Sequence, residues 1–209
     1  MNKKLIIFAK APVPGKVKSR LGKSIGMEKA CDIYRALLDC LISTCQEEES
    51  FKIVLYVAGS QDFFKKYYPK LKVKKQSEGD LGNRIHNAFK TELNDSTQVA
   101  LIGSDCPLLS MDHIQEAYKN LTSADLTIGP AKDGGYYLMA MNQAHQIFDG
   151  ITWSSELVLK ETLALAEQQN LNVELLETLS DLDTEADLKR HQEFFLNSNK
   201  LSALWPYPS

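Results

Sequence analysis

The sequence predicts an α/β protein built on a mostly parallel, doubly wound sheet with helices on both faces. Short apolar, β-rich runs alternate along the chain with segments whose apolar residues recur at helical spacing. A basic, glycine-containing loop follows the first apolar run directly. Ligands of such sheets bind outside the carboxyl ends of the strands, so we expect the chemistry of this protein in loops that follow strands.

The elements follow from this alternation, taken in chain order. Apolar periodicity predicts helices from Ala30 to Cys45 and from Leu81 to Leu93. Capping residues predict three more helices: 111–121 after Ser110, 155–169 after Ser154, and 185–196 after Thr184 with its partner Asp187. The predicted strands are 4–9, 52–58, 72–76, 98–103, 125–130, 136–141 and 172–177. We expect one domain over residues 1–197, followed by a tail over 198–209.

Composition excludes several classes of protein. With 209 residues and 44% hydrophobic content, the chain can bury a full core. The first apolar run is too short for a signal sequence or a membrane span, so we expect a cytoplasmic protein. Four cysteines without CxxC spacing or a histidine cluster disfavour a zinc site or a disulfide framework. A net charge of −3 without an extended basic face makes nucleic acid an unexpected partner.

The loop after the first strand concentrates positive charge. The segment FAKAPVPGKVKSRL (8–21) carries Lys10, Gly15, Lys16, Lys18 and Arg20. Residues 1–29 hold eight basic residues and one acidic residue, whereas the other 180 hold 16 basic and 26 acidic ones. Backbone NH groups near a glycine, followed by cations, are typical of phosphate binding. The alternative is a solvated basic loop.

Two enzyme classes find no support in these motifs. A Walker A loop requires a glycine where Lys10 stands and a hydroxyl where Val17 stands, which disfavours a P-loop kinase or GTPase. Ser104 lacks the GxSxG turn that presents a hydrolase nucleophile.

Two aspartates are candidates for binding a divalent cation. Asp105 comes directly after an apolar strand, and Asp183 lies in SDLDTEADL (180–188), after the last predicted strand. Magnesium or manganese on a diphosphate takes one or two carboxylates together with phosphate oxygens. The alternatives are structural, since Asp105 can fix its own turn and Asp183 can cap the following helix.

Two glycine-containing segments remain ambiguous. GPAKDGGYYLMAM (129–141) is typical of a hairpin, but its adjacent glycines would also allow a ligand to approach the backbone. In SEGDLGNR (77–84), Asp80 can bind a ribose or base edge, or cap the helix on which Arg84 lies.

The order of these motifs resembles a known family. AKAPVPGKVKSRL, GDLGNR, IGSDCPLL, DGGYYL, ITWSS and DLDTEADL occur as in bacterial glycosyltransferase-like proteins of the GT-A, or nucleotide-diphospho-sugar transferase, fold. The resemblance covers about residues 5–190. The family is also similar to the nucleotidyltransferases that make molybdenum-cofactor dinucleotides or guanylylate 2-phospholactate. Two departures are a basic loop without the GGxGxR pattern and a single Asp105 without a DxD pair.

The resemblance implies roles for individual residues and a magnesium or manganese cofactor. Lys16, Arg20 and Asp105 would be catalytic, with Asp105 on the metal. Asp183 stays the second metal candidate because of its position after the last predicted strand. The implied substrate-binding residues are Lys10, Gly15 and Lys18 near the phosphates, Asp80 and Arg84 near the nucleoside, and Lys132, Asp133, Gly134, Gly135 and Trp153 near the acceptor.

Three hypotheses for the function follow from these residues and from the resemblance. The first is a metal-assisted glycosyltransferase that uses a nucleoside diphosphate sugar and a small-molecule acceptor. The second is a nucleotidyltransferase that moves a nucleoside monophosphate from a triphosphate to a small phosphorylated acceptor. The third is a nucleotide-binding module without turnover, which the reduced metal motif suggests.

Overall fold

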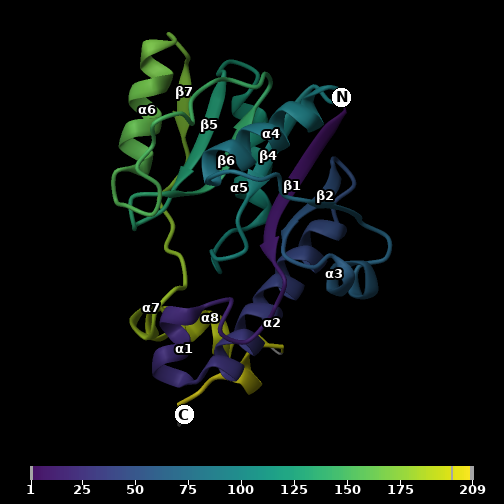
Figure 1. Cartoon of the computed structure of the whole chain (residues 1–209), viewed down its shortest axis with the longest axis vertical. Helices are drawn as coiled ribbons and strands as arrows, with labels where there is room; N and C mark the ends of the chain where they lie inside the picture. Colours follow the sequence, from purple (N-terminus) through teal and green to yellow (C-terminus); the bar gives the residue numbers. More distant parts are fainter. Residues whose placement is uncertain (1, 199, 208–209) are drawn as a thin grey trace.

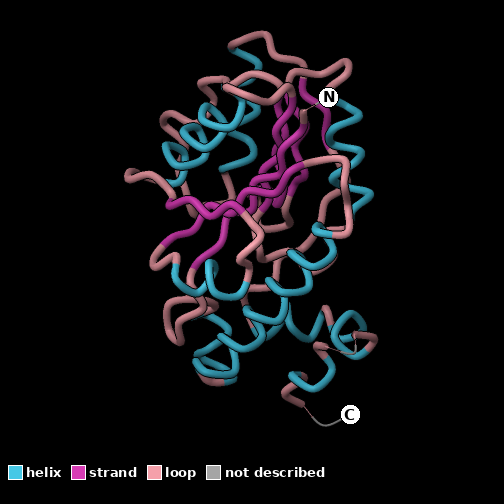
Figure 2. The backbone as a smooth tube through the Cα atoms, turned by 90° about the vertical axis from the view of Figure 1, so that its right-hand side faces the viewer, coloured by secondary structure: helices cyan, strands magenta, loops and turns pink. Residues whose placement is uncertain are grey.

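A seven-stranded sheet with helices on both sides forms the centre of the computed structural model, which describes residues 2–198 and 200–207 (Figures 1 and 2). Its strand order is β3-β2-β1-β4-β6-β5-β7. The strands are β1 (Lys3–Lys10), β2 (Lys52–Ala58), β3 (Lys72–Lys75), β4 (Gln98–Ile102), β5 (Leu126–Pro130), β6 (Tyr136–Met141) and β7 (Val173–Leu175). The helices are α1 (Ser19–Ile25), α2 (Met27–Gln46), α3 (Asp62–Tyr67), α4 (Leu81–Leu93), α5 (Met111–Asn120), α6 (Val158–Gln168), α7 (Glu185–Arg190), α8 (Gln192–Leu196) and the 3₁₀ turn η1 (Ser202–Leu204).

The sheet is parallel except at β6, as the sequence predicts. β1 pairs in parallel with β2 and β4, and β2 with β3, so the carboxyl ends of these four strands share one edge. β6 runs antiparallel to both β4 and β5, because the Asp-Gly-Gly turn closes the predicted hairpin. Tyr136, at the start of β6, therefore lies at the edge where β4 ends.

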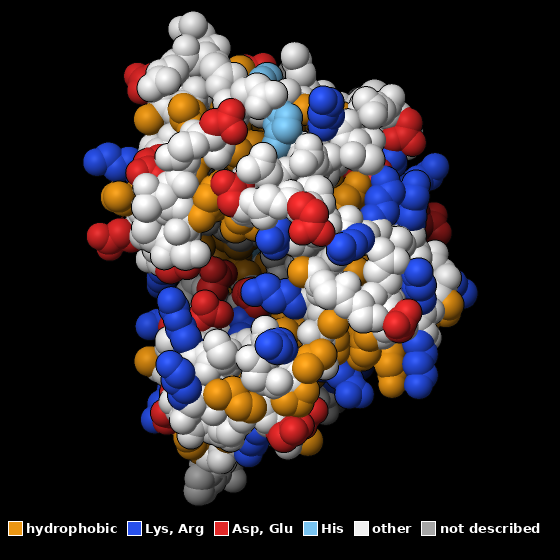
Figure 3. Space-filling model, in the orientation of Figure 1, with side chains coloured by type: hydrophobic (Ala, Val, Ile, Leu, Met, Phe, Trp, Pro, Cys, Tyr) orange, Lys and Arg blue, Asp and Glu red, His pale blue; other side chains and the backbone are white. Residues whose placement is uncertain are grey.

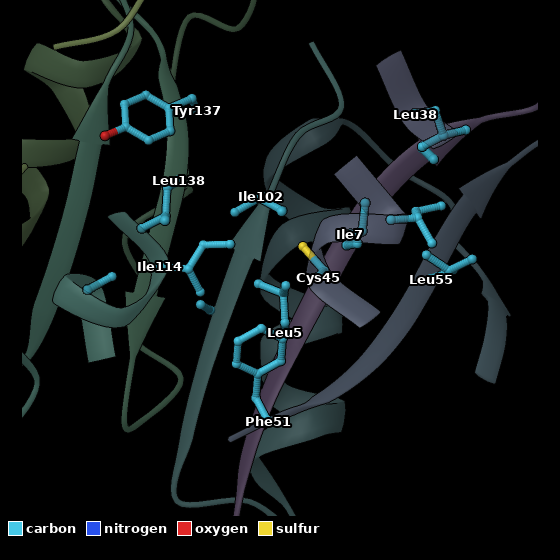
Figure 4. Close-up of a cluster of buried hydrophobic side chains, with 14 of the residues drawn as sticks. Leu5, Ile7, Leu38, Cys45, Phe51, Leu55, Ile102, Ile114, Tyr137 and Leu138 are labelled. Carbon is cyan, nitrogen blue, oxygen red and sulfur yellow. The ribbon is translucent and has the colours of Figure 1, made fainter. Parts of the chain in front are cut away.

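Alternate residues of the central strands pack on opposite faces of the sheet. In β1, Leu5 and Ile7 join the core shared with α2 and α5, whereas Ile6 and Phe8 join the core shared with α4 and α6. Figure 4 shows the first of these cores, in which Leu38 of α2 and Ile114 of α5 pack with residues of β1 and β4 such as Ile7 and Ile102. Burial on both faces explains why the strands appear in the sequence as continuous apolar runs.

A third, smaller core lies at one end of the molecule. Figure 1 shows α1, α7 and α8 gathered there beside α2 and the C-terminal segment. Leu21, Ile33, Leu188, Phe195 and Leu201 are buried in it. Leu201 belongs to the predicted tail, so the described part of that tail packs against the helices.

Some predicted element boundaries were wrong. Ser154 does not cap the helix after it: its φ is 65°, and α6 begins only at Val158. The predicted helix over 185–196 is interrupted at His191, whose NH is shared between the carbonyls of Asp187 and Leu188. Helices α1 and α3 were not predicted, because they are too short to show a helical period. Among the described residues, no helix is long and apolar enough to cross a bilayer.

Candidate functional site

A cavity of about 520 Å³ opens at the edge where β1 and β4 end and β6 begins. Its apolar floor includes Phe8, Leu101 and Leu138, one from each of these strands. Figure 3 shows the surface hollowed between the sheet and the end formed by α1 and α7, with acidic and basic side chains gathered around the hollow. The cavity therefore lies outside the carboxyl ends of the parallel strands, which is where doubly wound sheets bind their ligands.

The basic loop lines one side of this cavity. Lys10, Lys16, Lys18 and Arg20 all contribute to the wall, and Arg84 joins them from the first turn of α4. Gly15 provides the turn that aims the loop: its φ is 76°, and the NH of Lys16 donates to the carbonyl of Val13 at 2.9 Å. The predicted cations thus gather at one cavity.

Tyr34 of α2 fixes the point where the strand gives way to the loop. Its hydroxyl accepts from the NH of Lys10 at 2.8 Å and donates to the carbonyl of the same residue at 3.0 Å. Ser104, after β4, donates to the Tyr34 hydroxyl at 3.4 Å. Tyr34 lies within the predicted helix 30–45, and the apolar spacing that predicts this helix carries no signal for the polar role of the hydroxyl.

Lys18 joins the basic loop to both predicted metal ligands. Its ammonium forms an ion pair with Asp105 and a second one with Asp183, where Nζ lies 3.2 Å from Oδ1. The Lys18 side chain is 2% exposed, whereas those of Asp105 and Asp183 are 49% and 47% exposed. Burial disfavours the charged ammonium, but the two carboxylates outweigh it and raise the pKa of Lys18 above its usual value.

The structure separates the two roles considered for Asp183. Thr184, not Asp183, is the N-cap of α7: its Oγ1 accepts from the NH of Asp187, and the Asp187 carboxylate accepts from the NH of Thr184 at 2.9 Å. The capping alternative for Asp183 was therefore wrong. Its carboxylate faces Lys18 and the cavity instead.

A further aspartate, Asp181, lies close to these carboxylates. Burial raises the pKa of Asp181 to about 7, and the nearby carboxylates of Asp133 and Asp105 act in the same direction. At neutral pH this carboxyl is therefore protonated in part and adds less than a full negative charge. No role was predicted for Asp181, although it belongs to the acidic segment that contains Asp183.

The carboxylates of Asp105 and Asp183 fit a hard divalent cation only when a bound phosphate supplies further oxygen atoms. Asp105 and Asp183 come from loops after β4 and β7 and already converge on one cationic group. Two carboxylates are what magnesium commonly takes from a protein when phosphate oxygens complete its shell. Within residues 2–198 and 200–207, no three or more His, Cys, Asp or Glu side chains are grouped to hold a metal by themselves.

Several predicted substrate-binding residues have structural contacts and do not line the cavity. Asp80 caps α4, since its Oδ1 accepts from the NH of Asn83 at 2.8 Å. Trp153 packs on α4 so closely that a Cβ on Gly82 would come within 2.7 Å of the indole. Arg84 does line the cavity, with its Nε donating to the carbonyl of Gly79 at 2.9 Å.

The hairpin residues 132–135 also stand outside the cavity wall. A Cβ on Gly134 would lie 2.2 Å from the carbonyl oxygen of Glu156. The space beside this glycine is therefore filled by the backbone that precedes α6, which leaves no room for a ligand. Asp133 accepts from the NH of Gly135 at 2.9 Å, which fixes the turn, and Lys132 is exposed beside it. The hairpin interpretation of this segment is confirmed.

Comparison with known proteins identifies the family. Residues 41–155 match the family described as "Uncharacterized protein conserved in bacteria (DUF2064)". The chain belongs to this family. A solved protein of Desulfovibrio desulfuricans G20, provisionally named a nucleotide-diphospho-sugar transferase, is 30% identical, with a TM-score of 0.89 over 98% of this chain and 94% of that one.

A more distant sequence relative and a solved structure of the same fold agree with the resemblance found in the sequence. The 2-phospho-L-lactate guanylyltransferase of Methanocaldococcus fervens is 26% identical over 190 residues, which cover 88% of this chain and 82% of that enzyme. Rv0371c of Mycobacterium tuberculosis H37Rv, solved in complex with manganese, shares the fold alone: it is 14% identical, with a TM-score of 0.55 over 92% of this chain and 99% of that one. The nucleotidyltransferase-like α/β fold and the relation to 2-phospholactate nucleotidyltransferases are thereby confirmed.

Proposed function

We propose that this protein is a nucleotidyltransferase that moves a nucleoside monophosphate from a nucleoside triphosphate to a small phosphorylated acceptor. The observation that carries the proposal is the cavity wall, which the cations of Lys10, Lys16, Lys18 and Arg20 share with the carboxylates of Asp105 and Asp183. The guanylyltransferase relative, aligned over 88% of the chain, supports the same reaction class.

The charge of the cavity favours this reaction over glycosyl transfer, which the sequence analysis placed first. A nucleoside triphosphate carries more negative charge than the diphosphate of a nucleotide sugar. Four basic side chains from one eleven-residue loop line the cavity together with Arg84, against the two carboxylates of Asp105 and Asp183. The remaining positive charge is more than a diphosphate diester needs. We therefore place nucleotidyl transfer first and keep glycosyl transfer as the second candidate.

In the proposed reaction, a phosphate oxygen of the acceptor attacks the α-phosphorus of the triphosphate. A new P–O bond forms, and the bond from the α-phosphorus to the bridging oxygen breaks, with its electron pair leaving on pyrophosphate. Lys16 and Arg20 would hold the departing phosphates, and their positive charge lowers the barrier as negative charge develops there. Magnesium or manganese held by Asp105 and Asp183 would supply further charge neutralisation.

Product analysis tests the proposal. We would incubate the protein with each nucleoside triphosphate, magnesium or manganese, and a panel of small phosphorylated carboxylic acids that includes 2-phospho-L-lactate. Pyrophosphate release with a nucleotide-linked product, lost in Arg20→Ala and retained in Lys23→Ala, is the expected result. Lys23 is a matched control because it is an exposed cation of α1 that does not line the cavity.

The same panel distinguishes the other two functions. Release of a free nucleoside diphosphate from a nucleotide sugar would instead establish glycosyl transfer. Nucleotide binding without any product across both donor classes would favour the module without turnover.

A further inference from the structure

The ammonium of Lys18 occupies the position between Asp105 and Asp183 where the fold would hold a divalent cation. It pairs with both carboxylates at once, and its side chain is almost completely buried, whereas each aspartate side chain remains about half exposed. The two carboxylates therefore share one internal cation and still present surface to the cavity.

The backbone holds Lys18 in this place against its own preference. Its φ and ψ are 46° and 40°, the left-handed region that a long L side chain adopts only when its surroundings enforce it. Helix α1 starts at the next residue and needs nothing from this side chain, since Lys18 makes no side-chain cap contact. The two ion pairs that the ammonium forms with Asp105 and Asp183 offset the free-energy cost of this backbone conformation.

The same cavity offers the ammonium a second partner once an anion enters. Lys10, Lys16 and Arg20 line it with Lys18, so phosphates bound there would lie within the same wall. A phosphate bound in this cavity would thus offer the Lys18 ammonium an anionic partner other than the two aspartates.

We propose that Lys18 is a resident cation of the site, exchanged between the Asp105–Asp183 pair and an incoming polyphosphate, so that divalent-cation binding and polyphosphate binding are coupled. The proposal deepens the proposed function, because it assigns an order to the binding of the two components. Lys18 must leave the carboxylates for them to bind a divalent cation, and without phosphate it would then stay buried and unpaired. With phosphate present, the ammonium keeps an anionic partner throughout.

Thermodynamic linkage requires that the divalent cation and the polyphosphate change each other's affinity by the same factor, which can be measured. Each component should strengthen the binding of the other, typically by about 5- to 150-fold for coupled sites. Removing the ammonium should release the carboxylates, so that a divalent cation binds them without phosphate. The same change should weaken the binding of polyphosphate, because one cation of the wall is lost.

Two titrations on the wild-type protein and two variants test the exchange. Mn²⁺ binding is measured by electron paramagnetic resonance without phosphate, and inorganic tripolyphosphate binding by calorimetry in the presence of a chelator. In Lys18→Met we expect Mn²⁺ affinity to rise about 5- to 150-fold and tripolyphosphate affinity to fall. Lys16→Met is the control: it should lose tripolyphosphate affinity with unchanged Mn²⁺ affinity.

Further arms keep the test decisive if Lys18→Met does not fold. Lys18→Gly removes the ammonium and suits the left-handed backbone at this position. In the wild-type protein, Mn²⁺ and tripolyphosphate added together should raise the melting temperature by more than the sum of their separate effects. Unchanged or weaker Mn²⁺ affinity in the folded Lys18 variants, or merely additive shifts in the wild-type protein, would overturn the proposal. Because neither probe reacts, these outcomes are independent of whether nucleotidyl transfer is detected.

Discussion

Replacing Glu92 with glutamine should destabilise the protein without affecting its cavity. Glu92 lies on α4 and is fully buried, where its carboxylate accepts from the ammonium of Lys4 at 2.8 Å and from the hydroxyl of Tyr56 at 2.7 Å, and pairs with Lys74. None of these four residues lines the cavity. Burial disfavours the charged carboxylate, but these partners outweigh it and lower the pKa of Glu92 from 4.5 to about 2.

The size of the effect follows from that pKa. A fall from 4.5 to about 2 corresponds to roughly 3 kcal/mol of stability at neutral pH. Because the folded state has the lower pKa, this contribution is complete above the unfolded value near 4.5 and disappears as the pH falls to about 2. Glu92→Gln keeps the shape of the side chain but leaves the buried ammonium of Lys4 with less compensation.

Urea denaturation of the two proteins between pH 7 and pH 2 measures the difference. We expect a loss of about 3 kcal/mol at pH 7 that shrinks steadily below pH 4.5. Glu78→Gln is the matched control. The Glu78 side chain is 90% exposed and pairs with exposed Lys75, so the change should alter stability by less than about 0.5 kcal/mol. A Glu92→Gln loss below about 1 kcal/mol, or one that is constant with pH, would refute the reasoning.

Three other substitutions test the site and the hairpin. Arg20→Ala should weaken nucleoside triphosphate binding about tenfold or more in calorimetric titrations, because a charge-assisted contact to phosphate is lost, while Lys23→Ala should bind as the wild type does. Asp105→Asn should keep the fold but lower the melting temperature of the unliganded protein, because the buried ammonium of Lys18 is left with Asp183 alone. It should also abolish the extra stabilisation that magnesium gives to the nucleotide complex; a retained metal response would place the ligand elsewhere. Gly134→Ala should lower stability in urea by about 1 to 3 kcal/mol, since its Cβ meets the Glu156 carbonyl, whereas Gly150→Ala, with a similar φ but open space around it, should cost less.

The sheet could be predicted from the sequence because its physical signals are local. β2 and β6 have the predicted ends, and so does α4, whose helical period and Asp80 cap mark it clearly. The hairpin between β5 and β6 follows from the Asp-Gly-Gly turn alone. Helices α1 and α3 were missed because six or seven residues give too few apolar repeats to define a face.

The contacts within the site could be predicted only in part. Strand ends indicated which loops would meet, and Lys10, Lys16, Lys18, Arg20 and Asp105 do meet at one cavity. Lys18 is buried between two carboxylates, whereas Lys16 is exposed. The charge pattern could not show this difference, because both residues are lysines of the same loop. That difference arises from the left-handed turn at Lys18, which depends on contacts with distant loops.

The availability of the Asp183 carboxylate to a cation could have been predicted from the sequence by comparing the two residues that can cap α7. Asp183 and Thr184 can each cap a helix, but a capping box requires its partner three residues after the cap, and only Thr184 has an acidic residue, Asp187, at that distance. Once Thr184 is the cap, Asp183 has no helix end to satisfy, and its carboxylate is available to a cation. The structure places it on Lys18. The same local rule that defines the start of α7 thus directs the preceding carboxylate towards the cavity.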